Sequence, residues 1–459
     1  MQSQKTAFAP TSALARSGIA PTMVFLDQIA MALALALGSG ALHAVGAIAF
    51  SEAAVESLQT AFTGLWVALY IWAGGKLMLG HGLDWVRWLV ARRLALVVVL
   101  VIAACSVLWS VQPALTAQRS IHLVGTTLLA VYIGYHLSTK TVIDVFGIVL
   151  AGLIVGSAVV ALVFPEVGLH DYEGKLVWRG LQQEKNTFGL TSTTAFLFFF
   201  VRSISVNRAR PWLDWALCAA SLMCLVMSDS ATSLGALLAG LTVALCFLIG
   251  ASGRITTLVP LLGIGGGLCV ALLALLLTTG TGELFELFGR SSDITGRTVI
   301  WSGVLNLIDK HVLLGLGYGS IWYPRPQEGW LQMSLLGTHW VAFHAHNALL
   351  QVASELGLIA AIAAVVLLAQ TFYEAIRMFL RTHQPFALFM IAFNAAFIVV
   401  NVFEALLFSD RSPAWLLFIA LPIALLKSSP VASGSPDSAG PHWRHAKPLG
   451  SDEAGIVQT

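Results

Sequence analysis

The sequence predicts an all-α polytopic membrane protein, and three observations lead to this class. Of the 459 residues, 57% are hydrophobic and only 10% are charged, whereas soluble domains carry about 25% charged residues. The mean hydropathy is +0.82. Apolar runs of about 20 residues recur along the chain, and each is long enough to cross a hydrocarbon core of about 30 Å as a helix. A β-barrel would show short alternating segments instead, so helical spans are favoured.

Overall charge and cysteine content exclude several other classes. A formal net charge of +2 and a pI near 8.3 are too mild to indicate nucleic-acid binding. All five cysteines fall inside apolar runs. They form no CxxC pair, so we predict small packing residues and neither a metal centre nor a disulfide framework.

The chain divides into three regions, of which the transmembrane domain at residues 25–427 is by far the longest. We predict about 12 transmembrane helices, centred near residues 37, 67, 102, 129, 152, 194, 220, 241, 267, 360, 396 and 419. Residues 1–24 are polar, and no cleavage site follows a short apolar region, so we expect an uncleaved cytoplasmic segment. Residues 428–459 are rich in Ser, Pro and Gly, which predicts a disordered cytoplasmic tail.

The distribution of lysine and arginine predicts the orientation. If the amino terminus is cytoplasmic, most of the 25 lysines and arginines fall on inner segments, where short loops retain them. Both termini are therefore expected in the cytoplasm. Most outer cations lie in two long periplasmic loops, at about 164–186 and at about 281–345, between spans 9 and 10. Lysine and arginine in long loops are a poor signal of topology. Their clustering there indicates instead that these loops have a function.

The first loop ends in WRGLQQEKNTFG, which places Arg179 and Lys185 at the membrane surface beside Asn186. Arginine presents a planar fork of donors and lysine a compact charge, and both suit an anionic ligand such as phosphate. The alternative is that these cations only anchor the loop to lipid headgroups.

A serine-rich turn, SDSATS, separates the seventh and eighth spans and contains Ser230 and Thr232. Such residues usually cap the helix that follows. Outward-facing amides at a helix N-terminus can also bind an anion.

The second loop repeats the cationic pattern, because Arg290 and Arg297 flank SSDITG and precede an apolar stretch with helical spacing. We predict an interfacial helix that begins near Arg297. The GLGYG sequence further on lacks the strand and helix of a dinucleotide fold, so its glycines are expected to form tight turns.

His344 and His346 stand directly before the long apolar span that begins near Asn347. Neutral imidazole is the usual general base near neutral pH. A capping role and metal binding are the alternatives, but the sequence around HxH offers no third ligand at a recognisable spacing, so we expect no metal. Glu404 lies near the outer end of the last helical hairpin and is expected to line the same vestibule.

Five sequence blocks, WRGLQQEKNTFGL, SDSATSLGALLAGL, GRTVIW, LLGLGYGS and HAHNALLQVASELGLIAA, resemble those of the O-antigen ligase and polymerase superfamily. The resemblance covers roughly residues 175–365, and EKNTFG is similar to the exopolysaccharide polymerase branch. It implies a GT-C-like, metal-independent, inverting glycosyltransferase without a cofactor. The donor would be a polyprenyl-diphosphate-linked glycan, used on the periplasmic face of the bacterial inner membrane.

Position by position, the resemblance implies His346 as general base, with His344 as second choice. It implies Arg297 as a diphosphate ligand, with Lys185, Arg179 and Arg290 as further cations. Supporting positions are predicted at Asn186, Asn347, Ser230, Thr232 and Glu404. Ligase members commonly carry an arginine in the serine-rich turn, and SDSATS has none, which favours the polymerase branch.

The predicted function is polymerisation of repeat units of an exopolysaccharide or O-antigen. An O-antigen ligase that transfers glycan to lipid A-core is the alternative within this class, and a lipid-linked oligosaccharide flippase or transporter is the alternative from another class. Transporters place ionisable residues at mid-membrane depth, whereas the polar groups here gather near one surface. Expected partners are the lipid-linked donor, a glycan or lipid-core acceptor, membrane lipids and a regulator of chain length, with no nucleic acid.

Overall fold

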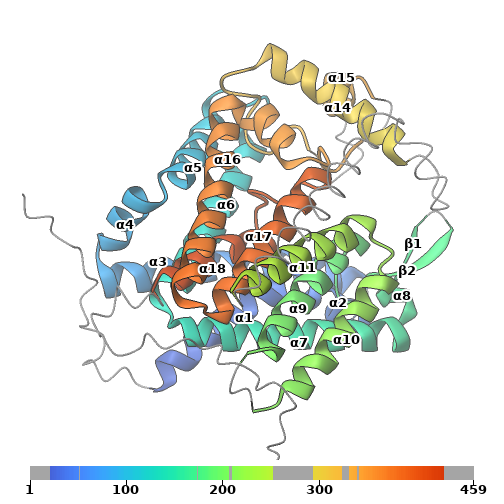
Figure 1. The fold of residues 1–459 in the computed structure, drawn as a ribbon. Helices are drawn as coiled ribbons and strands as arrows, with labels where there is room; N and C mark the ends of the chain where they lie inside the picture. The colour runs from blue at the N-terminus through green and yellow to red at the C-terminus, as the bar shows by residue number, and fades with distance from the viewer. Residues whose placement is uncertain are drawn as a thin grey trace, which may run out of the picture.

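The fold is a bundle of long helices with a small folded unit packed over one end (Figure 1). The computed structural model describes residues 21–50, 52–172, 174–205, 209–251, 293–322, 330–338 and 341–427. The helices of the bundle are α1 (Pro21–Gly38), α2 (Ala41–Ala49), α3 (Glu52–His81), α4 (Asp84–Arg92), α5 (Leu94–Cys105), α6 (Pro113–His136), α7 (Thr139–Val163), α9 (Lys185–Ser203), α10 (Pro211–Met227), α11 (Ala231–Ala251), α16 (Ala348–Thr382), α17 (Pro385–Phe403) and α18 (Pro413–Lys427). Short connections include the 3-10 helix η2 (Ser106–Leu108) and α8 (Pro165–Gly168).

Five helices in the described part of the chain are long and apolar enough to cross a membrane, and the number rises to seven if each of two bent pairs is one span. The five lie in α3, α7, α11, α16 and α17. This confirms an α-helical polytopic membrane protein. The expected span near residue 267 lies outside the described residues, and every other predicted centre falls within a helix.

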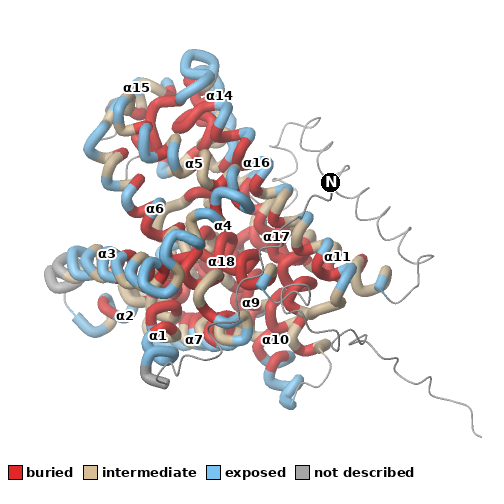
Figure 2. Tube along the Cα trace, turned by 90° about the vertical axis from the view of Figure 1, so that its left-hand side faces the viewer, coloured by how far each residue is buried: buried red, intermediate tan, exposed pale blue. Residues whose placement is uncertain are grey.

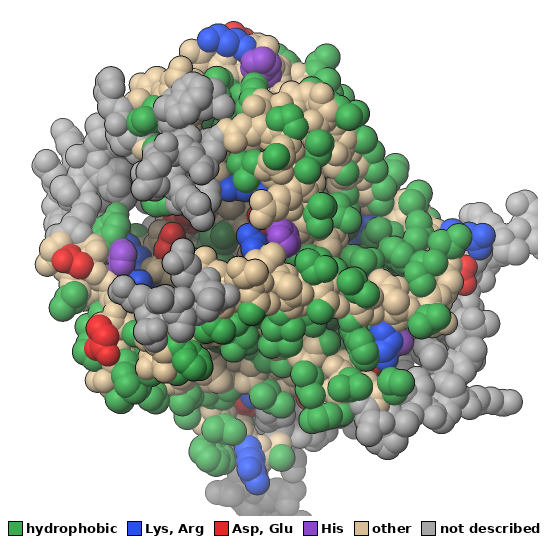
Figure 3. Space-filling model, turned by 180° about the vertical axis from the view of Figure 1, so that it is seen from behind, with side chains coloured by type: hydrophobic (Ala, Val, Ile, Leu, Met, Phe, Trp, Pro, Cys, Tyr) green, Lys and Arg blue, Asp and Glu red, His purple; other side chains and the backbone are tan. Residues whose placement is uncertain are grey.

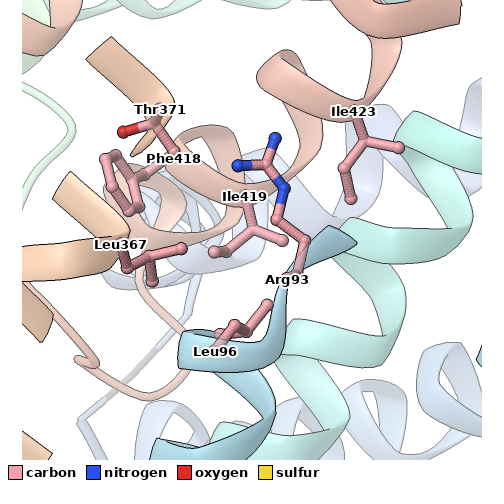
Figure 4. A pocket seen from close by; sticks show the side chains of 7 residues that line it. All are labelled: Arg93, Leu96, Leu367, Thr371, Phe418, Ile419 and Ile423. Atoms are coloured by element: carbon pink, nitrogen blue, oxygen red, sulfur yellow. The ribbon is translucent and has the colours of Figure 1, made fainter. Parts of the chain in front are cut away.

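Two bent pairs break the regular bundle. Helices α1 and α2 meet at 74°, where Gly40 has a positive φ of 83°, a conformation that glycine adopts without strain. Helices α4 and α5 meet at 104° around Arg93. The Arg93 side chain is buried, and its Nη2 lies 2.6 Å from Glu374 Oε2 on α16. The bend therefore turns a cation into the bundle, where it lines a narrow gap with α16 and α18 (Figure 4).

The core is formed by apolar side chains from almost every bundle helix. Figure 2 shows that the buried positions lie along the inner parts of these helices. Small residues bring some helix pairs close together, as transmembrane packing favours. A Cβ atom on Gly240 of α11 would lie 2.7 Å from the Ala392 carbonyl oxygen of α17, and one on Gly189 of α9 would lie 2.6 Å from Ser233 Oγ. These contacts fix α11 against both α9 and α17, whose ends carry polar residues.

Charged side chains inside the bundle are paired near helix ends. Asp27 of α1 is buried and lies 3.0 Å from Lys76 Nζ of α3, and Arg202, in the last turn of α9, pairs with buried Asp214 of α10. Pairing relieves part of the large cost of placing charge in an apolar medium. These pairs hold helices together.

The first loop contains a short antiparallel hairpin that was not predicted from the sequence. Strands β1 (Leu169–Tyr172) and β2 (Lys175–Trp178) pair from Leu169 with Trp178 to Tyr172 with Lys175. The turn contains Gly174, whose φ of 76° suits glycine. Four-residue strands give almost no periodic signal, which is why the sequence alone did not reveal them.

The second loop forms a folded unit, the cap, which consists of the described residues from α14 (Asp293–Lys310) through α15 (Trp330–Leu336) to residue 347. It has its own apolar core, which includes Ile300, Trp322 and Leu336. Gln332 is fully buried and its amide bonds the backbone of Ile321 and Ala342 at 2.7–2.8 Å. The predicted helix after Arg297 is confirmed as part of α14.

The GLGYG turn of the cap is locked into a break in α16. Gly357 has φ 80° and ψ 177°, so the helix is interrupted there. The carbonyl oxygens freed by the break, on Ser354 and Glu355, accept hydrogen bonds from Leu316 and Gly317 of the turn at 3.0 and 2.9 Å, and Leu358 N–H donates to the Val312 carbonyl at 2.8 Å. We call this backbone contact the cap clamp. The three glycines of GLGYG have positive φ, which confirms the prediction of tight turns.

Candidate functional site

A cluster of polar side chains lies where the cap meets the bundle. Its members come from five segments: Asn186 in the first turn of α9, Ser230 before α11, Arg297 in α14, His344 and His346 before α16, and Glu404 at the end of α17. A hollow between the cap and the bundle, with basic, acidic and histidine side chains gathered around it, is visible in Figure 3. We call these six residues the polar cluster.

Glu404 is the centre of the polar cluster and is only 7% exposed. Its Oε1 accepts a hydrogen bond from Asn186 Nδ2 at 2.9 Å and lies 3.8 Å from Arg297 Nη2. Its Oε2 lies 3.4 Å from His344 Nε2 and 3.6 Å from His346 Nδ1. A buried carboxylate needs such partners, because an unpaired charge in this position would be very costly.

His344 is held in one tautomer. Its Nδ1 accepts a hydrogen bond from the backbone N–H of His346 at 3.1 Å, so in the neutral ring the proton is on Nε2, which faces Glu404. Burial lowers the pKa of His344 to about 4, and the neighbouring His346 and Arg297 also lower it, against the opposing effect of Glu404. His344 is therefore a neutral donor near pH 7, and the Nδ1 lone pair that a base would use is occupied.

His346 has an unusual backbone. Its φ is 51°, in the left-handed region that histidine enters more readily than most residues but that remains uncommon. The segment is fixed by Trp301 of α14, whose Nε1 donates to the Ala345 carbonyl at 2.8 Å, and by Gln351, which accepts from Ala345 N–H at 3.1 Å. Strain that the surroundings maintain is typical of functional sites.

Asn347 caps α16. Its Oδ1 accepts from Leu350 N–H at 3.0 Å, and its Nδ2 donates to the Val402 carbonyl at 3.2 Å. The Asn347 side chain ties the start of α16 to the end of α17. For this reason the two histidines and Glu404 meet, although they are far apart in the sequence.

Asn186 connects the first loop to the serine-rich turn. Ser230 Oγ donates to Asn186 Oδ1 at 3.0 Å and lies 3.0 Å from Ser233 Oγ. Ser233 was not predicted, although its place three residues after Ser230 is a capping spacing that the sequence shows. Thr232 lies in the first turn of α11 and is partly exposed. Its neighbours Ser230 and Ser233 are the residues of this turn that bond Asn186.

Electrostatic coupling extends to a second carboxylate. Burial alone would raise the pKa of Glu404, but His346, His344 and Arg297 together lower it, so the carboxylate stays charged. Packing raises the pKa of Glu184, and the charge of Glu404 raises it further, while His346 and His170 oppose the change. Glu184 is exposed to solvent, and it interacts electrostatically with Glu404 and His346 from the edge of the polar cluster.

The other predicted cations have different surroundings. Lys185 is 8% exposed, and its Nζ lies 3.3 Å from the ring centroid of Tyr172 in β1. Arg179 donates from Nε to the Val167 carbonyl at 2.8 Å, so part of its guanidinium holds the loop together. Arg290 lies outside the described residues. Of the predicted cations, Arg297 is the one that the structure places beside the histidines and Glu404.

His344, His346 and Glu404 offer three donor atoms within 4.8 Å of one another, a spacing that suits a metal ion. The sequence near HxH contains no third ligand, and Glu404 supplies one only through the fold. The guanidinium of Arg297 lies beside the same carboxylate, and its charge lowers the pKa of His344. A positive charge this close opposes the binding of a metal cation.

The fold and the polar cluster define a polytopic helical membrane protein with an imidazole, carboxylate and guanidinium site beneath a folded cap. Residues 216–365 match the family model for O-Antigen ligase. The chain is also 25% identical over 362 residues to the exopolysaccharide production protein ExoQ of Rhizobium meliloti (strain 1021), which covers 74% of this chain and 78% of that protein. Both matches support the resemblance to the O-antigen ligase and polymerase superfamily that the sequence blocks indicated.

Proposed function

We propose that this chain is a metal-independent, inverting glycosyltransferase that moves glycan from a polyprenyl-diphosphate-linked donor to a sugar hydroxyl. The observation that carries the proposal is the meeting of His346, Arg297 and Glu404 in one cluster. The similarity to an exopolysaccharide production protein supports polymerisation of repeat units, and the absence of arginine from the SDSATS turn supports it further.

In the proposed reaction, the acceptor hydroxyl oxygen attacks the anomeric carbon and forms the new glycosidic bond. The bond from that carbon to the diphosphate oxygen breaks, and its electron pair leaves with the diphosphate. The hydroxyl proton passes to His346. Attack opposite the leaving group inverts the anomeric centre, and the diphosphate needs no proton from an acid because cations stabilise its charge.

Arg297 is the first choice for binding the diphosphate, because it is partly exposed and its contact with Glu404 is long, at 3.8 Å. Lys185 follows Glu184 and precedes Asn186, whose amide reaches Glu404, so it is a second cation near the site. Arg179 and Arg290 complete the proposed set. The proposed arrangement is a bacterial inner-membrane protein of about 12 spans with cytoplasmic termini and a periplasm-facing site.

The test is turnover of a synthetic lipid-linked repeat by purified protein without a membrane gradient. A ladder of longer products is expected from the parent, with chelator present or absent. His346→Ala is expected to lose a factor of about 10² to 10⁴ in rate, the usual contribution of a general base. Parental turnover by His346→Ala would refute the base assignment.

Loss of the gene separates polymerase from ligase. Mass spectrometry of the lipid-linked glycans is expected to show accumulation of single repeats. Accumulation of long lipid-linked chains would instead indicate a ligase, which shares the donor and differs in the acceptor.

A further inference from the structure

His346 Nδ1 is a buried nitrogen without a hydrogen-bond partner among the described residues. Glu404 Oε2 lies 3.6 Å from it, slightly beyond bonding distance. An unpaired polar atom in a buried place costs free energy, and catalytic hydrogen bonds are often long before substrate binds. These two atoms are therefore close to each other but do not form a hydrogen bond in this structure.

The two carboxylate oxygens of Glu404 have different partners. Asn186 Nδ2 holds Oε1 at 2.9 Å, so the carboxylate cannot rotate freely. Oε2 consequently faces the two imidazoles. His344 approaches it with a proton on Nε2, because its Nδ1 is occupied by the backbone of His346. The carboxylate acts on both rings as an acceptor.

A carboxylate facing His346 Nδ1 selects the tautomer with the proton on Nδ1. The lone pair is then on Nε2, the ring nitrogen on the opposite side. We infer that Glu404 is a positioning residue, whose carboxylate holds the proton on Nδ1 of His346 and directs Nε2 to the acceptor hydroxyl. This rests on the proposed function, because it assumes that His346 is the base.

In the transfer step, the hydroxyl proton moves to Nε2 and the resulting imidazolium keeps its other proton on Nδ1, bonded to Glu404. The carboxylate stays ionised throughout. Other charged or titratable groups that face this pair are Arg297 from α14, His344 from the same segment, and Glu184 from the first loop.

Glu404→Gln tests the inference sharply, because Asn186 dictates how the new amide is oriented. The Asn186 Nδ2 donor keeps the amide oxygen at the Oε1 position, which places the NH₂ group toward the histidines. His346 Nδ1 must then accept, so its proton moves to Nε2 and the base is lost. We expect kcat to fall about 10² to 10⁴-fold, with a much smaller change in KM for the donor.

The pH–rate profile separates positioning from a merely structural role. Without the carboxylate that stabilises the imidazolium, the acid limb of kcat is expected to move to lower pH. Simple loss of folded protein would scale the whole profile without moving the limb. Glu404→Asp keeps the charge and is expected to retain more activity than Glu404→Gln, and Glu184→Gln, which removes a nearby carboxylate, is expected to change kcat less than about tenfold.

The outcomes distinguish the inference from the proposed function. If His346→Ala is inactive while Glu404→Gln keeps the parental kcat and acid limb, His346 is the base but Glu404 does not position it. If Glu404→Asp is no better than Glu404→Gln, the charge is not what matters and the inference is overturned. If His346→Ala turns over normally, the base assignment itself fails.

Discussion

At the residue scale, the two histidines of HAHN have different tasks. His344 Nδ1 accepts a hydrogen bond from the backbone N–H of His346, so the proton of the neutral ring is on Nε2. His346 instead places its Nδ1 beside the carboxylate of Glu404. Their rings lie 4.1 Å apart between centroids. Two charged rings so close would repel each other, and the lowered pKa of His344 avoids this repulsion near pH 7.

The low pKa of His344 predicts a pH-dependent stability. The folded protein binds a proton at His344 only near pH 4, whereas the unfolded chain binds it near 6.5. Between these values the unfolded state holds more protons, so the free energy of unfolding falls as the pH falls. We expect a loss of at most about 2 kcal/mol between pH 7 and pH 5, measured by chemical unfolding in detergent.

His344→Gln is the control, because glutamine keeps a donor for Glu404 and does not titrate. Its unfolding free energy is expected to change less between pH 7 and pH 5. Equal pH dependence in both proteins would contradict the assignment of this effect to His344. Glu404 adds its own loss only below its ordinary pKa of 4.5, because its folded pKa is lowered.

Sequence alone predicted much of the cluster and not its connections. His346 and Arg297 were predicted because their types and positions before apolar helices fit the resemblance, and Asn186 and Ser230 were predicted as supports. The pairing of Glu404 with both histidines could not be derived, because it depends on α17 returning beside the start of α16. The tautomer of His344 depends on one backbone N–H, whose direction no residue pattern reveals.

At the element scale, the cap clamp determines where α16 is interrupted and how the cap is held. The break at Gly357 exposes carbonyl groups that a regular helix would use itself, and the GLGYG turn satisfies them. A glycine inside a long apolar run is usually only tolerated, so the sequence predicted an uninterrupted span. Tertiary contact with a loop about 40 residues earlier decides the local structure.

Gly357→Ala is expected to destabilise the protein by about 3 kcal/mol or more. The residue has φ 80°, and an added Cβ would clash with the Leu313 carbonyl oxygen, so both the backbone and the clamp would have to change. Thermal unfolding of the detergent-solubilised protein measures the effect.

Gly75→Ala in α3 is the matched control, because nothing lies within 4 Å of its added Cβ and alanine is the better helix former. It is expected to cause no loss of stability. A Gly357→Ala protein as stable as Gly75→Ala would show that the cap clamp does not hold the break.

At the scale of the whole molecule, the end of the first loop and the cap both reach Glu404 at the end of α17, whereas the charge pairs Arg93–Glu374 and Arg202–Asp214 join other helices. The sequence predicts that the polar groups gather near one surface, and the side of the membrane that this surface faces stays a prediction. The number of spans is harder to read from the chain, because α1–α2 and α4–α5 are bent, and a bend of 74° or 104° leaves hydropathy unchanged.

The proposed orientation is tested by single cysteines in a background without the five native ones. Lys175→Cys in the hairpin and Arg210→Cys before α10 both replace exposed residues. A membrane-impermeant maleimide added to intact spheroplasts is expected to label Cys at 175, and to label Cys at 210 only after permeabilisation. The reverse pattern would place the cap in the cytoplasm.

The assembly of the site from five segments has a consequence for domain exchange between relatives. The segment that matches the family model, residues 216–365, carries both histidines and Arg297 but neither Asn186 nor Glu404. A chimera that receives only this segment would combine His346, the proposed base, with the recipient's residues at the positions of Glu404 and Asn186. Its activity would depend on whether the recipient's side chains at positions 186 and 404 reach the donated residues as Asn186 and Glu404 do here, so a functional exchange requires residues 186 and 404 to be transferred together with the cap.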